Sequence, residues 1–197
     1  YCSQHCLYCG LRAENKNLTR YRMSVEEIVA RAKLIAQMGI KTVVLQSGED
    51  PYYTTEMMCD IIKQIKELDV AITLSIGERT FEEYRIWKEL GADRYLMRHE
   101  TASPELYAKL HPGDTFENRK AHLYEIKRLG YETGAGFMVG LPGQTPYDLA
   151  LDLAFLKEID ADMIGIGPYI PNPDTPLKDA NGGDLKTTLR MVALARI

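Results

Sequence analysis

Apolar and polar positions alternate along this chain in blocks that predict helices and strands in turn. A capping box, Ser24-Val25-Glu26-Glu27, precedes apolar positions at helical spacing that reach about Met38, and Gly39 ends this predicted helix. The β-branched run from Thr42 to Leu45 then predicts a buried strand. Further helices are expected at 55–68, 80–90, 104–109, 116–129, 146–159 and 185–197, and further strands at 70–75, 94–97, 132–139 and 163–166.

Strands that alternate with helices predict an α/β fold with a parallel sheet, either an open doubly wound sheet or a (β/α) barrel. A complete barrel takes about 250 residues, so a barrel of 197 residues would be a partial one that lacks the first strand and the last units. Both alternatives place function at the carboxyl ends of the strands. Polar residues follow the predicted strands, at 46–49, 77–78, 98–100, 140–144 and 167–169. No linker, repeat or charge block divides the chain, which predicts a single domain over 1–197.

Composition narrows the class of protein. The chain is 45% hydrophobic and 26% charged, which is typical of a soluble globular domain. Its net charge is −4, and basic and acidic residues are interspersed, so the basic stripe of a nucleic-acid binder is missing. No apolar run approaches the roughly 18 residues of a membrane span. We therefore expect a cytoplasmic protein that binds neither nucleic acid nor membranes.

Three of the four cysteines, Cys2, Cys6 and Cys9, lie within eight consecutive positions. A disulfide scaffold would spread its cysteines, whereas three grouped thiols form a set of soft metal ligands. Structural zinc sites usually take four ligands, but three thiolates on a four-iron cluster leave one iron open. Cys59 falls among the apolar positions of a predicted helix and is expected to pack there, and His5 is expected to be a solvent-exposed loop residue.

These motifs resemble a known family. CSQHCLYC resembles the CxxxCxxC signature of radical S-adenosylmethionine (SAM) enzymes, in which an aromatic residue precedes the last cysteine. Ser47-Gly48-Glu49 resembles the family's GGE-type motif, with Ser for the first Gly. The segment GFMVGLPGQ at 136–144 resembles the adenine-contacting GxIxGxxE region, with Gln144 at its acidic end.

Longer segments resemble the HydE family of FeFe-hydrogenase maturases over nearly the whole chain. They are YCGLRAENKNLTRYRM, TVVLQSGEDPYY, DRYLMRHETASPELYAKLHP, GYETGAGFMVGLPGQT and DMIGIGPYIPNPDTPL. Biotin synthase and methylornithine synthase are the nearest competing families. Biotin synthase needs ligands for a second cluster, and outside the cysteine loop this chain has only Cys59, which disfavours that alternative.

The resemblance implies a radical SAM barrel of the TIM type in which Cys2, Cys6 and Cys9 hold a 4Fe-4S cluster and SAM binds the open iron. Reductive cleavage would give methionine and a 5′-deoxyadenosyl radical, with the protein supplying orientation and exclusion of water. The residues implied in SAM binding are Tyr8, Ser47, Gly48, Glu49, Glu100, Arg119, Met138 and Ile166.

Individual roles follow from the same resemblance. Glu100 is expected to bind the ribose hydroxyls, Arg119 the carboxylate of SAM, and Tyr8, Met138 and Ile166 the adenine. From the sequence alone, however, Arg119 is more simply interpreted as a solvated helix arginine, Gly48 also suits an ordinary turn, and Met138 suits barrel packing.

Two residues just after the strand at 94–97 extend this assignment. Arg98 follows apolar strand positions, where an unpaired charge would be costly, and is expected to bind a substrate carboxylate. His99 should point the other way, toward the helices.

Three functional hypotheses follow. The first is a maturase acting on an iron-bearing, cysteine-derived precursor of the hydrogenase two-iron subcluster, together with other maturases and an electron donor such as ferredoxin or flavodoxin. The second is a radical SAM mutase or C–H-activating enzyme that acts on a small amino acid, similar to methylornithine synthase or to biotin synthase. The third is an electron-transfer or metal-binding module that does not bind SAM.

Overall fold

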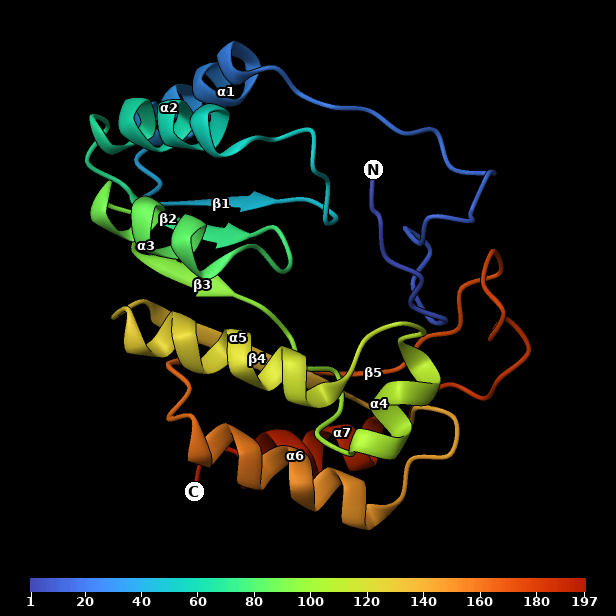
Figure 1. Cartoon of the computed structure of the whole chain (residues 1–197). Coiled ribbons are helices and arrows are strands. Elements are labelled where there is room, and N and C mark those ends of the chain that lie inside the picture. Colours follow the sequence, from blue (N-terminus) through green and yellow to red (C-terminus); the bar gives the residue numbers. More distant parts are fainter.

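Five parallel strands form one sheet in the order in which they occur along the chain (Figure 1). The computed structural model describes all residues from 1 to 197. The strands are β1 (Thr42–Gln46), β2 (Ala71–Ser75), β3 (Arg94–Leu96), β4 (Glu132–Val139) and β5 (Met163–Pro168). The helices are α1 (Val25–Gln37), α2 (Thr55–Lys66), α3 (Phe81–Glu89), α4 (Pro104–Leu110), α5 (Phe116–Arg128), α6 (Pro146–Glu158) and α7 (Leu185–Leu194).

The strand order decides between the two predicted architectures. A doubly wound sheet reverses direction partway through its strand order, whereas here each strand pairs with the next one in the chain. This is the order of a (β/α) barrel. The sheet is open, with β1 and β5 at its two edges, so the expected partial barrel is confirmed.

The predicted elements are all present, and their ends differ from the prediction by a few residues. The capping boxes at Ser24 and Thr80 form as expected, and Thr145 with Asp148 forms a further one at the start of α6. The largest difference is at the last helix, which ends at Leu194.

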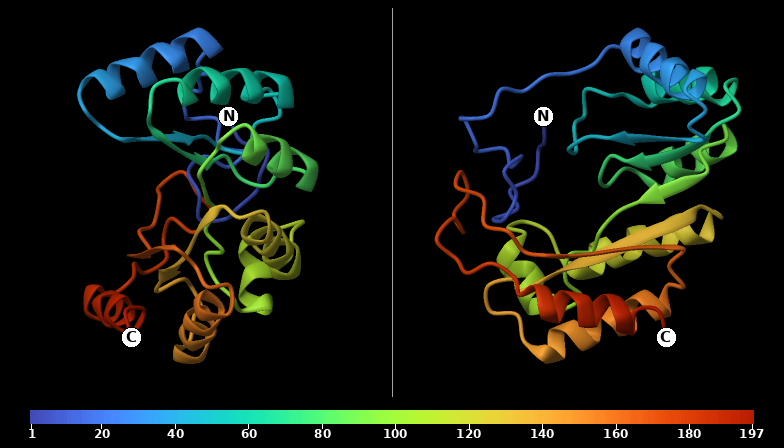
Figure 2. Two further views of the ribbon diagram at one scale, coloured as in Figure 1. Left: turned by 90° about the vertical axis from the view of Figure 1, so that its left-hand side faces the viewer. Right: turned by 180° about the vertical axis from the view of Figure 1, so that it is seen from behind.

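Apolar side chains between the sheet and the helices hold these elements together. Ile61, Ile62 and Ile65 of α2 are fully buried against the same cluster as Ile72 and Leu74 of β2. Each such side chain contributes about 1.5–3 kcal/mol on burial. The helices lie around the sheet in all three ribbon views (Figures 1 and 2). The sheet therefore provides a rigid support for the loops that follow its strands.

The residues before α1 reach the rim formed by the carboxyl ends of the strands. Ser3 N donates to Glu49 O at 2.9 Å, and Leu7 N donates to Leu110 O at 2.9 Å. The N-terminal segment and the loop after β5 both lie at this end of the sheet (Figures 1 and 2). No helix in this fold has the length and apolar character required to cross a bilayer.

Candidate active site

The cysteine loop is a series of tight turns. Cys9 N donates to Cys6 O at 3.2 Å, and Arg12 N donates to Cys9 O at 3.1 Å. Cys2, Cys6 and Cys9 are all free thiols of intermediate exposure. Burial, together with the neighbouring Cys9 thiol, raises the pKa of Cys6 to about 12. Burial therefore favours the neutral form of the Cys6 thiol until a metal displaces its proton.

These thiols fit an iron–sulfur cluster better than a single metal ion. The chain has no group of three His, Cys, Asp or Glu side chains gathered as the ligands of one ion. A four-iron cluster takes one thiolate per iron, so its ligands need not converge on a single point. Three partly exposed thiols in one loop are a suitable donor set for such a cluster.

Gly48 brings the Ser47-Gly48-Glu49 segment against this loop. A Cβ atom at Gly48 would lie 2.4 Å from Tyr1 O and 2.6 Å from Cys2 Cβ. Only glycine permits this approach, so Gly48 is more than an ordinary turn residue. The hydroxyl of Ser47 donates to Gly48 O at 2.7 Å.

The carboxylate of Glu49 points from this segment toward the next loop. Its Oε1 accepts from Glu78 N at 2.9 Å, and its Oε2 accepts from the amide of Gln4. Gly77 leaves the space that the Glu49 side chain fills, because a Cβ there would lie 1.9 Å from Glu49 Cγ. Glu49 thereby connects the cysteine loop with the loop after β2.

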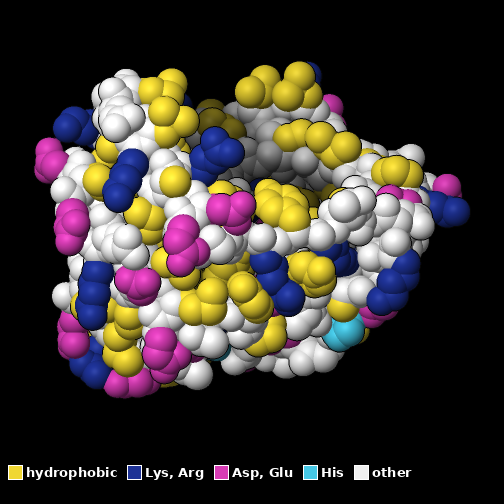
Figure 3. Space-filling view, turned by 90° about the horizontal axis from the view of Figure 1, so that it is seen from above, with side chains coloured by type: hydrophobic (Ala, Val, Ile, Leu, Met, Phe, Trp, Pro, Cys, Tyr) yellow, Lys and Arg dark blue, Asp and Glu magenta, His cyan; other side chains and the backbone are white.

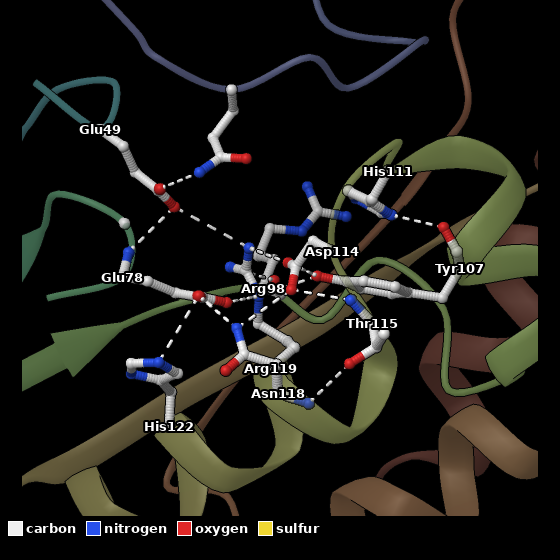
Figure 4. Close-up of polar contacts among 12 residues, drawn as sticks. Glu49, Glu78, Arg98, Tyr107, His111, Asp114, Thr115, Asn118, Arg119 and His122 are labelled. Carbon is white, nitrogen blue, oxygen red and sulfur yellow. Dashed lines mark hydrogen bonds and ion pairs between the residues drawn. The ribbon is translucent and has the colours of Figure 1, made fainter.

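Arg119 lies at the centre of the site (Figure 4). Its side chain, from the first turn of α5, is only 11% exposed, so the solvated interpretation is wrong. Arg119 Nε lies 2.8 Å from Glu78 Oε1 and donates to Tyr107 Oη at 3.2 Å. The contacts of its terminal nitrogens are longer: 3.5 Å to Arg98 O, and 3.9 Å to both Glu49 Oε1 and Asp114 Oδ2. The outer edge of the guanidinium is therefore suited to a further carboxylate.

Glu78 is a site residue to which the sequence analysis gave no role. Besides the ion pair of its Oε1 with Arg119, its Oε2 accepts from Asn118 Nδ2 at 2.7 Å and lies 3.5 Å from His122 Nε2 (Figure 4). Burial is the main reason that the pKa of Glu78 rises to about 7, with Asp114 and Glu49 adding to the rise and Arg119 opposing it. The available signal was its place in the polar pair 77–78 that follows the predicted strand at 70–75.

Tyr8 connects the cysteine loop to α4. Its hydroxyl lies 2.8 Å from His111 Nε2, and the His111 ring stacks on Tyr107 at a centroid distance of 3.9 Å. Burial lowers the pKa of His111 to about 4, so the imidazole is neutral at pH 7. His111, Tyr107 and Asp114 are further residues that sequence reasoning missed.

Arg98 and Glu100 lie beside each other just after β3. Arg98 Nη2 donates to Phe137 O at 2.7 Å and lies 3.4 Å from Glu100 Oε2. Both Arg98 Nε and Glu100 Oε2 are buried without a hydrogen bond, and burial raises the pKa of Glu100. Unpaired buried polar atoms of this kind fit a polar ligand. His99 is fully buried beside Asp152 of α6, which confirms its expected direction toward the helices.

Met138 and Ile166 lie on the neighbouring strands β4 and β5. Met138 N donates to Glu100 O at 3.1 Å, and its side chain packs on a small cluster that includes Tyr169. Gln144 shapes the turn after β4: its Oε1 accepts from Gly140 N, and its Nε2 donates to Met138 O at 2.9 Å. Glutamate could not make the second bond, which accounts for Gln at this position.

Cys59 and His5 lie outside the assembled site. Cys59 is partly buried and packs against the main apolar cluster, as expected. His5 is exposed, and its Nδ1 lies 2.5 Å from Glu14 Oε1.

A groove of about 640 Å³ reaches the site from the edge of the sheet. Its walls are mostly apolar, and they include Val44 of β1, Ser47 and Gly48. Figure 3 shows the hollow from above, with hydrophobic side chains along its rim. The groove therefore borders Gly48, which contacts the start of the cysteine loop.

Comparison with known proteins agrees with this geometry. Residues 1–156 match the family model described as the radical SAM superfamily. The chain belongs to the radical SAM superfamily. A 4Fe-4S cluster and SAM are the cofactors that this membership implies, and the thiols and unpaired polar groups described above fit them.

Specific relatives share most of this radical SAM chain. It is 63% identical to the [FeFe] hydrogenase maturase subunit HydE of Thermotoga maritima over 100% of its own length and 56% of that protein. It is 30% identical to 3-methylornithine synthase of Methanosarcina acetivorans, covering 100% of this chain and 57% of the relative. The crystal structure of methylornithine synthase (PylB) superposes with a TM-score of 0.87 at 29% identity, covering 100% and 60%. The chain thus spans somewhat over half the length of these relatives.

Proposed function

We propose that this chain is the SAM-cleaving core of a hydrogenase maturase similar to HydE. One observation carries the proposal: the cysteine loop, Glu49, Glu100 and Arg119 meet at one rim of the sheet. The 63% identity to HydE over the whole chain supports the choice among radical SAM functions. When bound, the cluster supplies the electron that cleaves SAM into methionine and a 5′-deoxyadenosyl radical.

The residues of this chain would bind and orient SAM. The terminal nitrogens of Arg119 would bind its carboxylate, and Ser47, Gly48 and Glu49 would contact its methionine end. The unpaired oxygen of Glu100 would accept hydrogen bonds from the ribose hydroxyls. Tyr8, Met138 and Ile166 would then surround the adenine.

Arg98 is the proposed contact for the substrate of the radical. Its Nε is buried and unpaired, so a substrate carboxylate would satisfy it. We infer that the substrate is an iron-bearing, cysteine-derived precursor of the hydrogenase two-iron subcluster. Other hydrogenase maturases, an electron donor such as ferredoxin or flavodoxin, and a cytoplasmic location belong to the same proposal.

The test is anaerobic reconstitution with iron and sulfide, reduction, and measurement of 5′-deoxyadenosine. We expect product from the wild-type chain and from Cys59→Ala, which removes the thiol outside the loop. Cys6→Ala should abolish it, because one iron would lose its thiolate. A cluster whose spectrum is unaffected by SAM, with no product, would support an electron-transfer module and contradict the proposal.

A mutase similar to methylornithine synthase is the second candidate, favoured by the 0.87 TM-score. Because Arg98 suits the carboxylate of either substrate, that residue does not separate the two. Assay of the reconstituted chain with deuterated iron-free amino acids and with a deuterated iron–cysteine complex separates them. Deuterium transferred into 5′-deoxyadenosine only from an iron-free amino acid would favour the mutase.

A further inference from the structure

His99 and Asp152 form a polar pair inside the apolar layer between the sheet and the helices. Both side chains are 0% exposed, and His99 Nε2 lies 3.3 Å from Asp152 Oδ1. The rings of Phe137 and Phe155 surround the imidazole at centroid distances of 6.0 and 5.0 Å. Burial lowers the pKa of His99 and raises the pKa of Asp152, which disfavours the charged form of each.

Stability does not account for this pair. Both ring nitrogens of His99 and Oδ2 of Asp152 are buried without a hydrogen bond. Buried polar groups in this state reduce the free energy of unfolding, and an apolar pair of similar volume would avoid the loss. The presence of this polar pair is better explained by its effect on the neighbouring backbone.

The carboxylate of Asp152 holds the chain at two points, on either side of Glu100. It contacts the side chain of His99, and its Oδ1 also accepts from Ala102 N. Between these points Glu100 has a φ of 64°, a left-handed conformation that is unfavourable for glutamate. Such strain persists only where the surroundings impose it.

The sheet fixes the same residue from its other side. Gly136 O accepts from both His99 N, at 3.0 Å, and Glu100 N, at 2.9 Å, while Glu100 O accepts from Met138 N at 3.1 Å. With the backbone held by β4 and by Asp152, the Glu100 side chain lies at the rim, 3.4 Å from Arg98.

We propose that Asp152 is a positioning residue that keeps Glu100 in its strained conformation and so sets the affinity of the site for the ribose of an adenosine ligand. The inference rests on the proposed function, because Glu100 is the ribose contact only if SAM binds. Asp152 is a fully buried residue of α6, and its contacts beside Glu100 are with the His99 side chain and the backbone of Ala102.

Binding of the two products of SAM cleavage distinguishes a positioning role of Asp152 from a general structural role. 5′-Deoxyadenosine carries the ribose but no amino acid, whereas methionine carries the amino acid but no ribose. Isothermal titration of each into the reconstituted chain measures the two halves of the site independently. Asp152→Leu should weaken 5′-deoxyadenosine binding about tenfold and leave methionine binding within about twofold. Asp152→Asn keeps an oxygen that can accept from Ala102 N, so its loss should be smaller.

Leu156→Ala is the matched control, because Leu156 is buried on the same helix but lies outside the pair. It should lower Tm without changing the ratio of the two affinities. Equal weakening of both ligands by the Asp152 variants, or unchanged 5′-deoxyadenosine binding, overturns the inference. If Asp152→Leu does not fold, the ratio of the 5′-deoxyadenosine and methionine affinities of Asp152→Asn is the test. A wild-type chain that binds neither ligand overturns the proposed function itself.

Discussion

At the scale of single residues, the main feature of the site is that three carboxylates surround the guanidinium of Arg119. Glu49, Glu78 and Asp114 all lie within 3.9 Å of Arg119. Burial is the main cause that raises the pKa of Glu78, and the neighbouring Asp114 and Glu49 add to it because one cation cannot fully compensate three partly buried carboxylates. The ion pair with Glu78 orients the Nε edge of the Arg119 guanidinium, whereas its terminal nitrogens make only longer contacts.

Glu78→Gln should change the pH dependence of stability. The pKa of Glu78 is about 7 in the folded chain, against an ordinary value of 4.5. Between these values the folded state binds more protons than the unfolded state, so wild-type stability falls as pH rises through this window. Relative to the variant, the wild type should lose roughly 3 kcal/mol between pH 4.5 and 8, measured by urea unfolding.

His111→Gln should reveal a pH dependence of stability opposite in sign to that of Glu78→Gln. Burial lowers the pKa of His111 to about 4, so the unfolded state binds more protons between pH 4 and 6.5, and wild-type stability should rise with pH there relative to this variant. A wild-type-to-Glu78→Gln difference that is constant with pH would contradict the assignment of the raised pKa to Glu78.

Among the secondary-structure elements, the pairing of β4 with β5 requires a close approach that only glycine allows. A Cβ atom at Gly136 would lie 2.0 Å from Gly165 O, a backbone atom that cannot move alone. The same strand carries Met138 and supports Glu100 through its backbone. Packing of these two strands therefore determines where Met138 and Glu100 lie at the rim.

Gly136→Ala should destabilise the chain by about 1–3 kcal/mol, because the strands must separate to admit the methyl group. For a chain of this length that lowers Tm by about 2–4 °C per kcal/mol. Gly167→Ala, on the neighbouring strand, is the control: nothing lies within 4 Å of its Cβ position, so the change should stay within about 0.5 kcal/mol. Equal shifts of Tm in the two variants would contradict the steric explanation.

Polar contacts attach the segment that carries the cysteine loop to the rest of the chain. The Arg22 guanidinium donates to both oxygens of Asp50, at 2.7 and 2.9 Å, and these bonds hold the pKa of Asp50 below its usual value. Asp50 is buried in the loop after β1. This pair fixes the end of the N-terminal segment, and Ser3 fixes its beginning through Glu49 O.

Asp50→Asn should loosen residues 1–23 while leaving the sheet intact. The loss of a charge-assisted pair should cost about 1–2 kcal/mol and speed amide hydrogen exchange in the cysteine loop but not in β2. Because the folded pKa of Asp50 is depressed, the difference should be present at neutral pH and disappear as pH falls through that pKa. Asp69→Asn is the control, since its pair with Lys41 is almost fully exposed. Unchanged exchange in the loop would show that other contacts hold it.

Much of the fold and part of the site could be predicted from the pattern of residues. Helix caps such as Ser24 and Thr80 act within a few positions, and strand and helix periods are local, so the elements were predicted to within a few residues. The cysteines share one loop, so their grouping was visible too. The burial of Arg119 was not, because its partners Glu78 and Glu49 lie 41 and 70 positions away.

The sequence by itself determined the order and type of the elements, the three grouped thiols and the rim at which polar residues gather, because each depends on neighbours along the chain. Only the tertiary structure decided that the sheet is wound in one direction, that Arg119 is held by Glu78, and that Asp152 lies behind Glu100. Those contacts depend on how side chains from separate elements pack once parallel strands have brought their carboxyl ends together, and no local pattern specifies them.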